Sequence, residues 1–151
     1  MSLTDLMAAV HTQVLPAADR DTVLRAAAEL LSCRQAGSGE LYASLCEREA
    51  LGSTAIGHGI AIPHGRSPAL LEPRGALIRL QGPIEFTGGE AVDLLFAMAV
   101  PSHYTHQHLM LLSELAERFS DPLYRQALRE AADADGLLRL LTDFPPQASA
   151  A

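Results

Sequence analysis

Residues 92–100 form a nearly unbroken apolar run, VDLLFAMAV, which Pro101 ends. Apolar residues without alternation are typical of a central β-strand that is covered on both faces. Segments on either side of this run carry apolar residues at helical spacing. The sequence therefore predicts an α/β chain of mixed α+β type, in which a single mixed β-sheet is flanked by helices on both faces.

Turn and capping signals divide the rest of the chain into short elements. Asp19 or Asp21 can cap one helix, Ser38 can cap the next, and Asp121 followed by Pro122 is typical of a helix start. Helices are expected at residues 3–10, 19–32, 38–52, 104–119, 122–131 and 135–142. Further strands are expected at residues 54–63, 76–80 and 84–86, with turns at Gly82-Pro83 and Gly88-Gly89.

The length of 151 residues fits one domain, so we expect residues 1–151 to form a single unit with a frayed tail from Pro145-Pro146 onward. No apolar run approaches the about 20 residues of a membrane-spanning helix. The start, MSLTDLMAAV, lacks the basic and apolar regions of a secretory signal. We therefore expect a soluble, cytoplasmic protein without membrane insertion. The net charge of −7, with no basic stripe, argues against a nucleic-acid partner.

The two cysteines, Cys33 and Cys46, fall inside helix-like segments. Neither has the spacing of a metal ligand. We expect both thiols to be free, reduced and half-buried.

The segment GHGIAIPHGR, at residues 57–66, predicts an imidazole held at the end of a short strand. By the two-residue period of a strand, Ile60, Ile62 and His64 share one side. Pro63 fixes its own φ and keeps Ile62 extended, so the backbone before the ring is held still.

A neutral imidazole at this position can do chemistry, because its unperturbed pKa of about 6.5 leaves it nucleophilic near pH 7. It can attack phosphorus and hold a phosphoryl group covalently. Such a site needs donors or cations for the phosphoryl oxygens. Gly65 leaves the His64 ring uncrowded, and Arg66 supplies positive charge. These residues alone leave open that His64 is a surface histidine after a turn.

A second group of histidines, HYTHQH at residues 103–108, follows the predicted central strand. If strands 60–63 and 92–100 are parallel neighbours, their ends coincide and His108 can face His64. One ring would then accept a phosphoryl group while the other steadies its oxygens.

Zinc binding is the rival interpretation of these histidines. His103 and His106 are three residues apart, which a helix can use for one metal ion. His106 and His108 would point about 200° apart on a helix and could not share an ion. No cysteine or carboxylate lies at ligand spacing beside them. A further alternative is that His103 and His106 are solvated loop residues.

Three segments carry a resemblance to a known family: LGSTAIGHGIAIPHGR (51–66), VDLLFAMAVP (92–101) and HLMLLSELAERF (108–119). Together they resemble the IIA domain of the bacterial phosphoenolpyruvate-dependent phosphotransferase system, of the mannitol/fructose-type class and closest to its nitrogen-regulatory branch. The resemblance covers about residues 4–143. It implies a mixed sheet between helices and a protein that needs no metal or organic cofactor.

The resemblance also implies the principal site residues. His64 matches the histidine that accepts a phosphoryl group from the phosphohistidine of an HPr-like carrier. His108 matches the second active-site histidine, and Arg48, in EREALGS, matches an arginine close to the phosphorylated ring. Without the resemblance, Arg48 at a helix C-terminus simply offsets the helix dipole.

Other residues are candidates for a supporting role around the phosphoryl group. Ser53 and Thr54 have hydroxyls that can donate to it, although capping or turn bonding also accounts for them. Gly65 and Arg66 follow the acceptor directly, and Arg66 also fits a plain surface charge. Asp93 orients a histidine or serves a turn.

The sequence departs from the family pattern at two places. His58 stands where nitrogen-type members usually have Asn, and the segment before His108 is rich in histidine, which leaves His106 as an alternative second histidine. The resemblance implies a phosphotransferase component with a regulatory output. Its partners would be an HPr-like phosphocarrier and regulatory target proteins. The alternatives are a sugar-specific IIA that passes phosphate to a separate IIB chain, or a histidine-cluster metal-binding domain.

Overall fold

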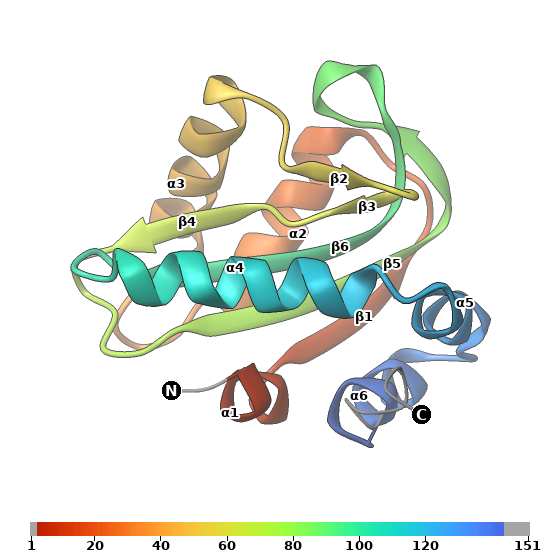
Figure 1. Cartoon of the computed structure of the whole chain (residues 1–151). Helices are drawn as coiled ribbons and strands as arrows, with labels where there is room; N and C mark the ends of the chain where they lie inside the picture. The colour runs from red at the N-terminus through yellow and green to blue at the C-terminus, as the bar shows by residue number, and fades with distance from the viewer. Residues whose placement is uncertain (1–2, 144–151) are drawn as a thin grey trace.

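The computed structural model describes residues 3–143 and contains one mixed six-stranded sheet (Figure 1). The sheet order is β1-β5-β6-β3-β2, and β4 also pairs with β6. The strands are β1 (His11–Leu15), β2 (Ala55–Gly57), β3 (Ile60–Ala61), β4 (His64–Ser67), β5 (Arg74–Glu85) and β6 (Ala91–Pro101). This architecture confirms the predicted fold class.

Strand β6 is the centre of the sheet, as its apolar run predicted. It pairs antiparallel with β5 on one side and parallel with both β3 and β4 on the other. Residues 94–101 of this strand are all buried. A strand enclosed on both faces cannot tolerate exposed polar side chains, and this explains why the run shows no alternation.

Two helical layers cover the sheet (Figure 1). Helices α2 (Arg20–Leu31) and α3 (Ser38–Leu51) pack on one face around a cluster that includes Leu24, Leu45 and Leu95. The opposite face carries α1 (Leu3–Ala8), α4 (His106–Phe119), α5 (Pro122–Glu130) and α6 (Ala134–Asp143). Their shared core includes Phe96 and Leu115.

Capping residues set the helix starts largely as expected. The Asp19 carboxylate accepts from the Thr22 N–H at 2.8 Å, and Asp121 accepts from the Leu123 N–H at 2.9 Å, with Pro122 as the first helical residue. The expectation for α3 was wrong, because Gly37 is the N-cap and its side chain makes no capping bond. Ser38 is instead the first residue inside the helix.

The structure corrects two further expectations in the strands. Gly82-Pro83 does not turn the chain: β5 continues through it, with a register irregularity between Arg79 and Ile84 that accommodates a proline without an N–H. The real turn is η1 (Thr87–Gly89), at the predicted glycine pair. Strand β1 was not predicted at all. It pairs parallel with β5 and precedes Pro16.

Cys33 and Cys46 are free and half-buried, as predicted. Within residues 3–143, no helix combines the length and the apolar character that crossing a bilayer requires. The tail that the sequence marked as frayed lies outside the described residues.

Candidate functional site

A break in one line of strand pairing places His64. Both β3 and β4 pair parallel with β6, with Ile60 opposite Leu94 and His64 opposite Met98. Ile62 and Pro63 interrupt this line, and the Pro63 carbonyl accepts from the Met98 N–H at 2.9 Å. His64 therefore begins β4, and the expectation that it ends a strand was wrong. The parallel pairing with β6, which was the condition for His108 to face His64, is present.

The glycine after His64 is required by packing. A Cβ on Gly65 would lie 2.6 Å from the Ser44 Oγ of α3, too close for any side chain. The same hydroxyl accepts from the Arg66 N–H at 2.8 Å. Helix α3 thus lies directly against β4, and Arg48 in its last turn is close enough to His64 to act on it through its charge.

The His64 ring is held in one orientation by the main chain. Its Nδ1 lies 2.8 Å from the Ile62 carbonyl oxygen. Because a carbonyl oxygen only accepts, Nδ1 carries the proton and Nε2 keeps its lone pair. The side chain is half-buried. The ring is thus a fixed imidazole whose nucleophilic nitrogen is Nε2.

His108 is the histidine that lies beside it. The two ring centroids are 5.1 Å apart and the planes are tilted by 54°. His108 lies in the first turn of α4 and is 4% exposed. Its Nδ1 is buried without a partner among the described residues. A buried unpaired N–H costs more than an unpaired lone pair, so the favoured tautomer has its proton on Nε2, available as a donor.

The electrostatics keep both rings uncharged at neutral pH. Burial lowers the pKa of His64, the hydrogen bond to Ile62 partly opposes this, and the Arg48 and Arg66 charges lower it further. Burial also lowers the pKa of His108, and the neighbouring His64 and the same two arginines add to the effect, bringing it to about 4. Neutral imidazoles are the nucleophilic and donor forms that the site chemistry needs.

The two arginines whose charges act on the ring pair lie on different elements, Arg48 on α3 and Arg66 on β4. Arg48 donates from Nη1 to the Gly52 carbonyl at 2.9 Å, which fits its position at the end of α3. Arg66 donates from Nη1 to the Ser102 carbonyl at 3.2 Å and to the Tyr104 carbonyl. Both guanidiniums have further N–H groups that these bonds do not use.

The predicted hydroxyl donors are engaged in local bonds. The Ser53 Oγ accepts from the Ala55 N–H at 3.1 Å, a turn contact. The Thr54 hydroxyl is buried and donates to Glu49 Oε1. Sequence reasoning overlooked Glu49, although the four-residue spacing from Leu41 and Leu45 puts it on the buried face of α3.

The other histidines of the cluster lie away from the pair. His103 is exposed and its ring packs against Tyr104, 5.2 Å between centroids. His106 is exposed at the start of α4. In the part of the chain that the structure describes, no three His, Cys, Asp or Glu side chains lie together as metal ligands would.

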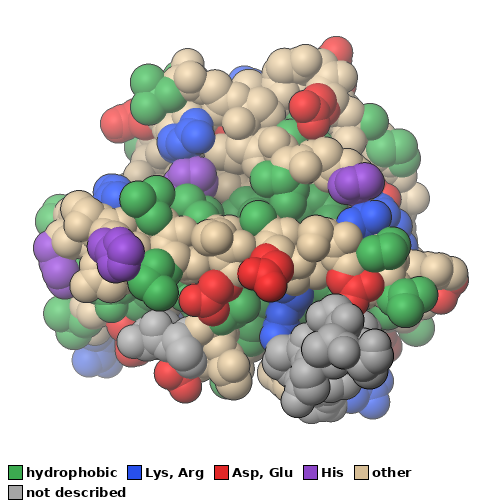
Figure 2. Space-filling view, viewed as in Figure 1, with side chains coloured by type: hydrophobic (Ala, Val, Ile, Leu, Met, Phe, Trp, Pro, Cys, Tyr) green, Lys and Arg blue, Asp and Glu red, His purple; other side chains and the backbone are tan. Residues whose placement is uncertain are grey.

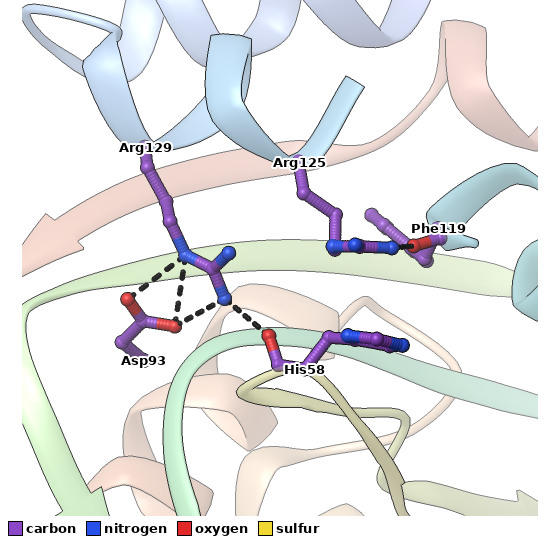
Figure 3. Close-up of polar contacts among 5 residues, drawn as sticks. All are labelled: His58, Asp93, Phe119, Arg125 and Arg129. Atoms are coloured by element: carbon purple, nitrogen blue, oxygen red, sulfur yellow. Dashed lines mark hydrogen bonds and ion pairs between the residues drawn. The ribbon is translucent and has the colours of Figure 1, made fainter. Parts of the chain in front are cut away.

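Asp93 binds an arginine that the sequence gave no reason to single out. Arg129 of α5 contacts both Asp93 oxygens, with a closest distance of 2.8 Å, and also donates to the His58 carbonyl at 2.5 Å (Figure 3). His58 has a φ of 57°, at the tip of the β2–β3 turn. Its ring projects away from the ion pair, on the side where Arg125 and Phe119 lie.

Hydrophobic side chains gather in the middle of the face of the molecule that Figure 2 shows. A histidine and basic side chains lie next to them. The exposed apolar residues of the adjoining elements are Leu51 at the end of α3, Ile56 of β2, and Leu109 and Met110 after His108. Exposed apolar residues around a polar centre are typical of a surface where another protein docks.

Comparison with known proteins agrees with this geometry. Residues 7–144 match the family described as the phosphoenolpyruvate-dependent sugar phosphotransferase system, EIIA 2. A nitrogen regulatory protein of Bradyrhizobium diazoefficiens is 34% identical over 156 residues, covering 99% of this chain and 100% of that protein. Another similar chain is the crystal structure of nitrogen regulatory protein IIA-Ntr from Neisseria meningitidis, with a TM-score of 0.82, 30% identity and coverage of 93% and 99%.

A more distant structure shares the fold. It is the complex of enzyme IIA-Mtl with phosphorylated enzyme IIB-Mtl from Escherichia coli, whose matched chain has a TM-score of 0.65 and 21% identity. The match covers 85% of this chain and 93% of that one.

Proposed function

Because the chain belongs to the EIIA 2 family of the phosphoenolpyruvate-dependent sugar phosphotransferase system, whose members carry a phosphoryl group on a histidine, we propose that His64 is its phosphoryl acceptor. The protein is a phosphotransferase component, as the sequence predicted. The observation that carries the assignment to His64 is the ring itself: Nδ1 is bonded to the Ile62 carbonyl, and Nε2 is left with a lone pair beside His108.

The transfer step needs no base. The Nε2 lone pair of His64 attacks the phosphorus of a donor phosphohistidine and forms a new N–P bond. The N–P bond to the donor breaks in line, and its electron pair returns to the donor ring. His64 keeps its Nδ1 proton, whose bond to the Ile62 carbonyl stabilises the positive charge that develops on the ring.

The neighbouring groups stabilise the phosphoryl oxygens. His108 presents an Nε2–H donor, and its shielded position fixes that donor before the reaction begins. Arg48 and Arg66 supply positive charge, since both already act on the two rings electrostatically. Ser53, Thr54 and Gly65 support the loop and the strand around the acceptor through their local contacts.

Domains of this family work with phosphocarrier proteins and IIB components. For this chain we propose an HPr-like carrier as donor, docking on the exposed apolar residues around the ring pair. The output that we favour is regulatory, because a relative that matches over nearly the whole of both chains is a nitrogen regulatory protein. Phosphorylation adds about −1.5 to −2 charges to this apolar surface, enough to repel a target that binds the neutral form.

A sugar-specific role is the second candidate. It is favoured by the fold shared with a mannitol IIA protein solved in complex with its phosphorylated IIB. The two outputs use the same His64 chemistry and differ only in what receives or reads the phosphoryl group. Adding IIB chains to the labelled protein separates them, since onward transfer removes the label from His64.

The test of the acceptor is phosphorylation with enzyme I, an HPr-like carrier and labelled phosphoenolpyruvate. Wild type should gain an acid-labile, base-stable label, and His64→Ala should gain none. His106→Ala is the matched control and should be labelled like wild type, because its exposed ring lies outside the pair. Label retained in the His64→Ala protein would move the acceptor elsewhere.

A further inference from the structure

A buried carboxyl group lies next to the acceptor and has no role in the transfer described above. Glu49 is 4% exposed, on the inward face of α3. One oxygen, Oε1, accepts from the Thr54 hydroxyl, whereas Oε2 is buried with no partner among the described residues. A half-satisfied buried carboxylate is costly, so its retention next to a reactive ring calls for a function.

Hydrogen bonds connect this carboxyl group to the acceptor ring. Thr54 donates its hydroxyl to Glu49, and its carbonyl accepts from the Ile62 N–H at 3.0 Å. The Ile62 carbonyl in turn accepts from His64 Nδ1 at 2.8 Å. Thr54 and Ile62 lie on opposite arms of the β2–β3 turn. The Glu49–Thr54 contact therefore anchors one arm to α3, and the other arm carries the carbonyl that orients the ring.

We infer that Glu49 and Thr54 are positioning residues for phosphoryl transfer: their buried contact holds the Ile62 carbonyl against His64 Nδ1 and so makes Nε2 the reacting nitrogen. The inference rests on the proposed role of His64. It explains why a carboxyl group is buried at the end of α3, where an apolar residue would continue the stripe of Leu41 and Leu45 at lower cost.

Electrostatics give Glu49 a second effect on the same ring. Its charge raises the pKa of His64, against the lowering caused by burial and by Arg48. A more basic nitrogen is a better nucleophile, provided that it stays unprotonated. Glu49 thereby offsets part of the loss of nucleophilicity that burial imposes on the imidazole.

The first test removes the hydroxyl of Thr54 while keeping its shape. In Thr54→Val, the nitrogen NMR signals of the His64 imidazole should show a mixture of tautomers in place of Nδ1–H alone. The phosphorylation rate should fall by about 10- to 100-fold, the size expected when a nucleophile is misplaced by about an ångström. Thr54→Ser restores the hydroxyl and should recover both the single tautomer and most of the rate.

The second test removes the charge of Glu49 and keeps the acceptor. The amide oxygen of Glu49→Gln can still accept from Thr54, so the tautomer should stay as in wild type. The pKa of His64 should fall, as measured by NMR titration, and transfer should slow. Glu47→Gln on the exposed side of the same helix carries the same change in net charge and is the control. It should alter neither quantity.

The outcomes separate this inference from the proposed function. If His64 is labelled, but Thr54→Val keeps the wild-type tautomer and rate, the inference fails and the proposed function stands. If His64 is never labelled, the proposed function fails, whatever the tautomer. Should Thr54→Val not fold, Glu49→Leu decides, because it removes the acceptor of the Thr54 hydroxyl and continues the apolar stripe of α3. A single wild-type tautomer of His64 in this variant overturns the inference, and a mixture of tautomers supports it.

Discussion

Two regions each carry a histidine: the tip of the β2–β3 turn, at His58, and the break before β4, at Ile62, Pro63 and His64. Their polar groups are used in opposite ways. At the tip, Arg129 and Asp93 are joined to each other and to the His58 main chain, while the His58 side chain is exposed. At the break, the main chain holds the His64 ring itself, and the nearby cations and His108 retain unused donors. The polar groups of the tip hold a loop in place, whereas those of the break leave donors unused beside a fixed ring.

The largest expected difference between the two regions is in phosphoryl transfer. His108→Ala removes the donor beside the acceptor and should slow phosphorylation by about 10²- to 10³-fold, as for other transition-state donors. His58→Ala should leave the rate near that of wild type, because the tip is held through the His58 carbonyl. Both rates are measured with the same carrier. Equal losses of phosphorylation rate in His108→Ala and His58→Ala would show that the two regions do not differ in phosphoryl transfer.

The glycine after His58 gives the tip a second distinguishing property, in its stability. Gly59 has a φ of 80°, and a Cβ there would lie 2.6 Å from Arg129 Nη2 and 2.9 Å from Asp93 Oδ1. Gly59→Ala should lower the free energy of unfolding by about 2 kcal/mol, because alanine is disfavoured in a left-handed backbone conformation. Displacement of the Arg129 side chain should add to this loss. Urea denaturation measures this change. The folded fraction should still be labelled on His64, and a variant as stable as wild type would contradict the strained turn.

Acid should lower the free energy of unfolding, because the buried His108 beside His64 must then take up a proton. Its pKa is about 4 in the folded protein, below its ordinary value of 6.5, so the unfolded chain binds more protons between these two pH values. The stabilisation is complete above pH 6.5 and is lost as the pH falls toward 4. We expect a loss of about 3 kcal/mol over this window, since the two pKa values differ by about 2.5 and one pKa unit corresponds to about 1.4 kcal/mol. Denaturation of His108→Gln should show a smaller pH dependence.

The smallest effect is expected from the ion pair at the tip. Asp93 and Arg129 are partly exposed, with side-chain exposures of 24% and 33%. Asp93→Asn should therefore cost only about 1 kcal/mol. A double-mutant cycle with Arg129→Gln isolates the pairwise energy. A coupling several times larger would mean that the tip is as tightly organised as the break.

Much of the arrangement around His64 was predictable, because it follows from the two-residue period of a β-strand. Ile60, Ile62 and His64 share a face as a strand period requires, and parallel pairing with β6 brings the following helix, with His108, over the same face. The sequence left His106 open as the partner of His64. Only the helix phase decides this, since the third residue of α4 turns inward and the first turns to solvent.

What the sequence did not reveal depends on contacts between distant elements. Strand β1 is short, half-exposed and polar at its start, so its residue pattern does not predict a strand. Its parallel pairing with β5 stabilises it as one. The passage of β5 through Gly82-Pro83 likewise depends on its neighbour. The inward position of Glu49 was predictable from its spacing to Leu45, but its hydrogen bond from the Thr54 hydroxyl was not.

We propose that a neutral His64, with Nδ1 bonded to the Ile62 carbonyl, reacts through Nε2. The most direct measurement is NMR of the phosphorylated protein with labelled nitrogen, which identifies the nitrogen bonded to phosphorus through its coupling. We predict phosphorus on Nε2 of His64, with Nδ1 still carrying its proton. Phosphorus on Nδ1, or on the ring of another histidine, would show that Nε2 of His64 is not the acceptor.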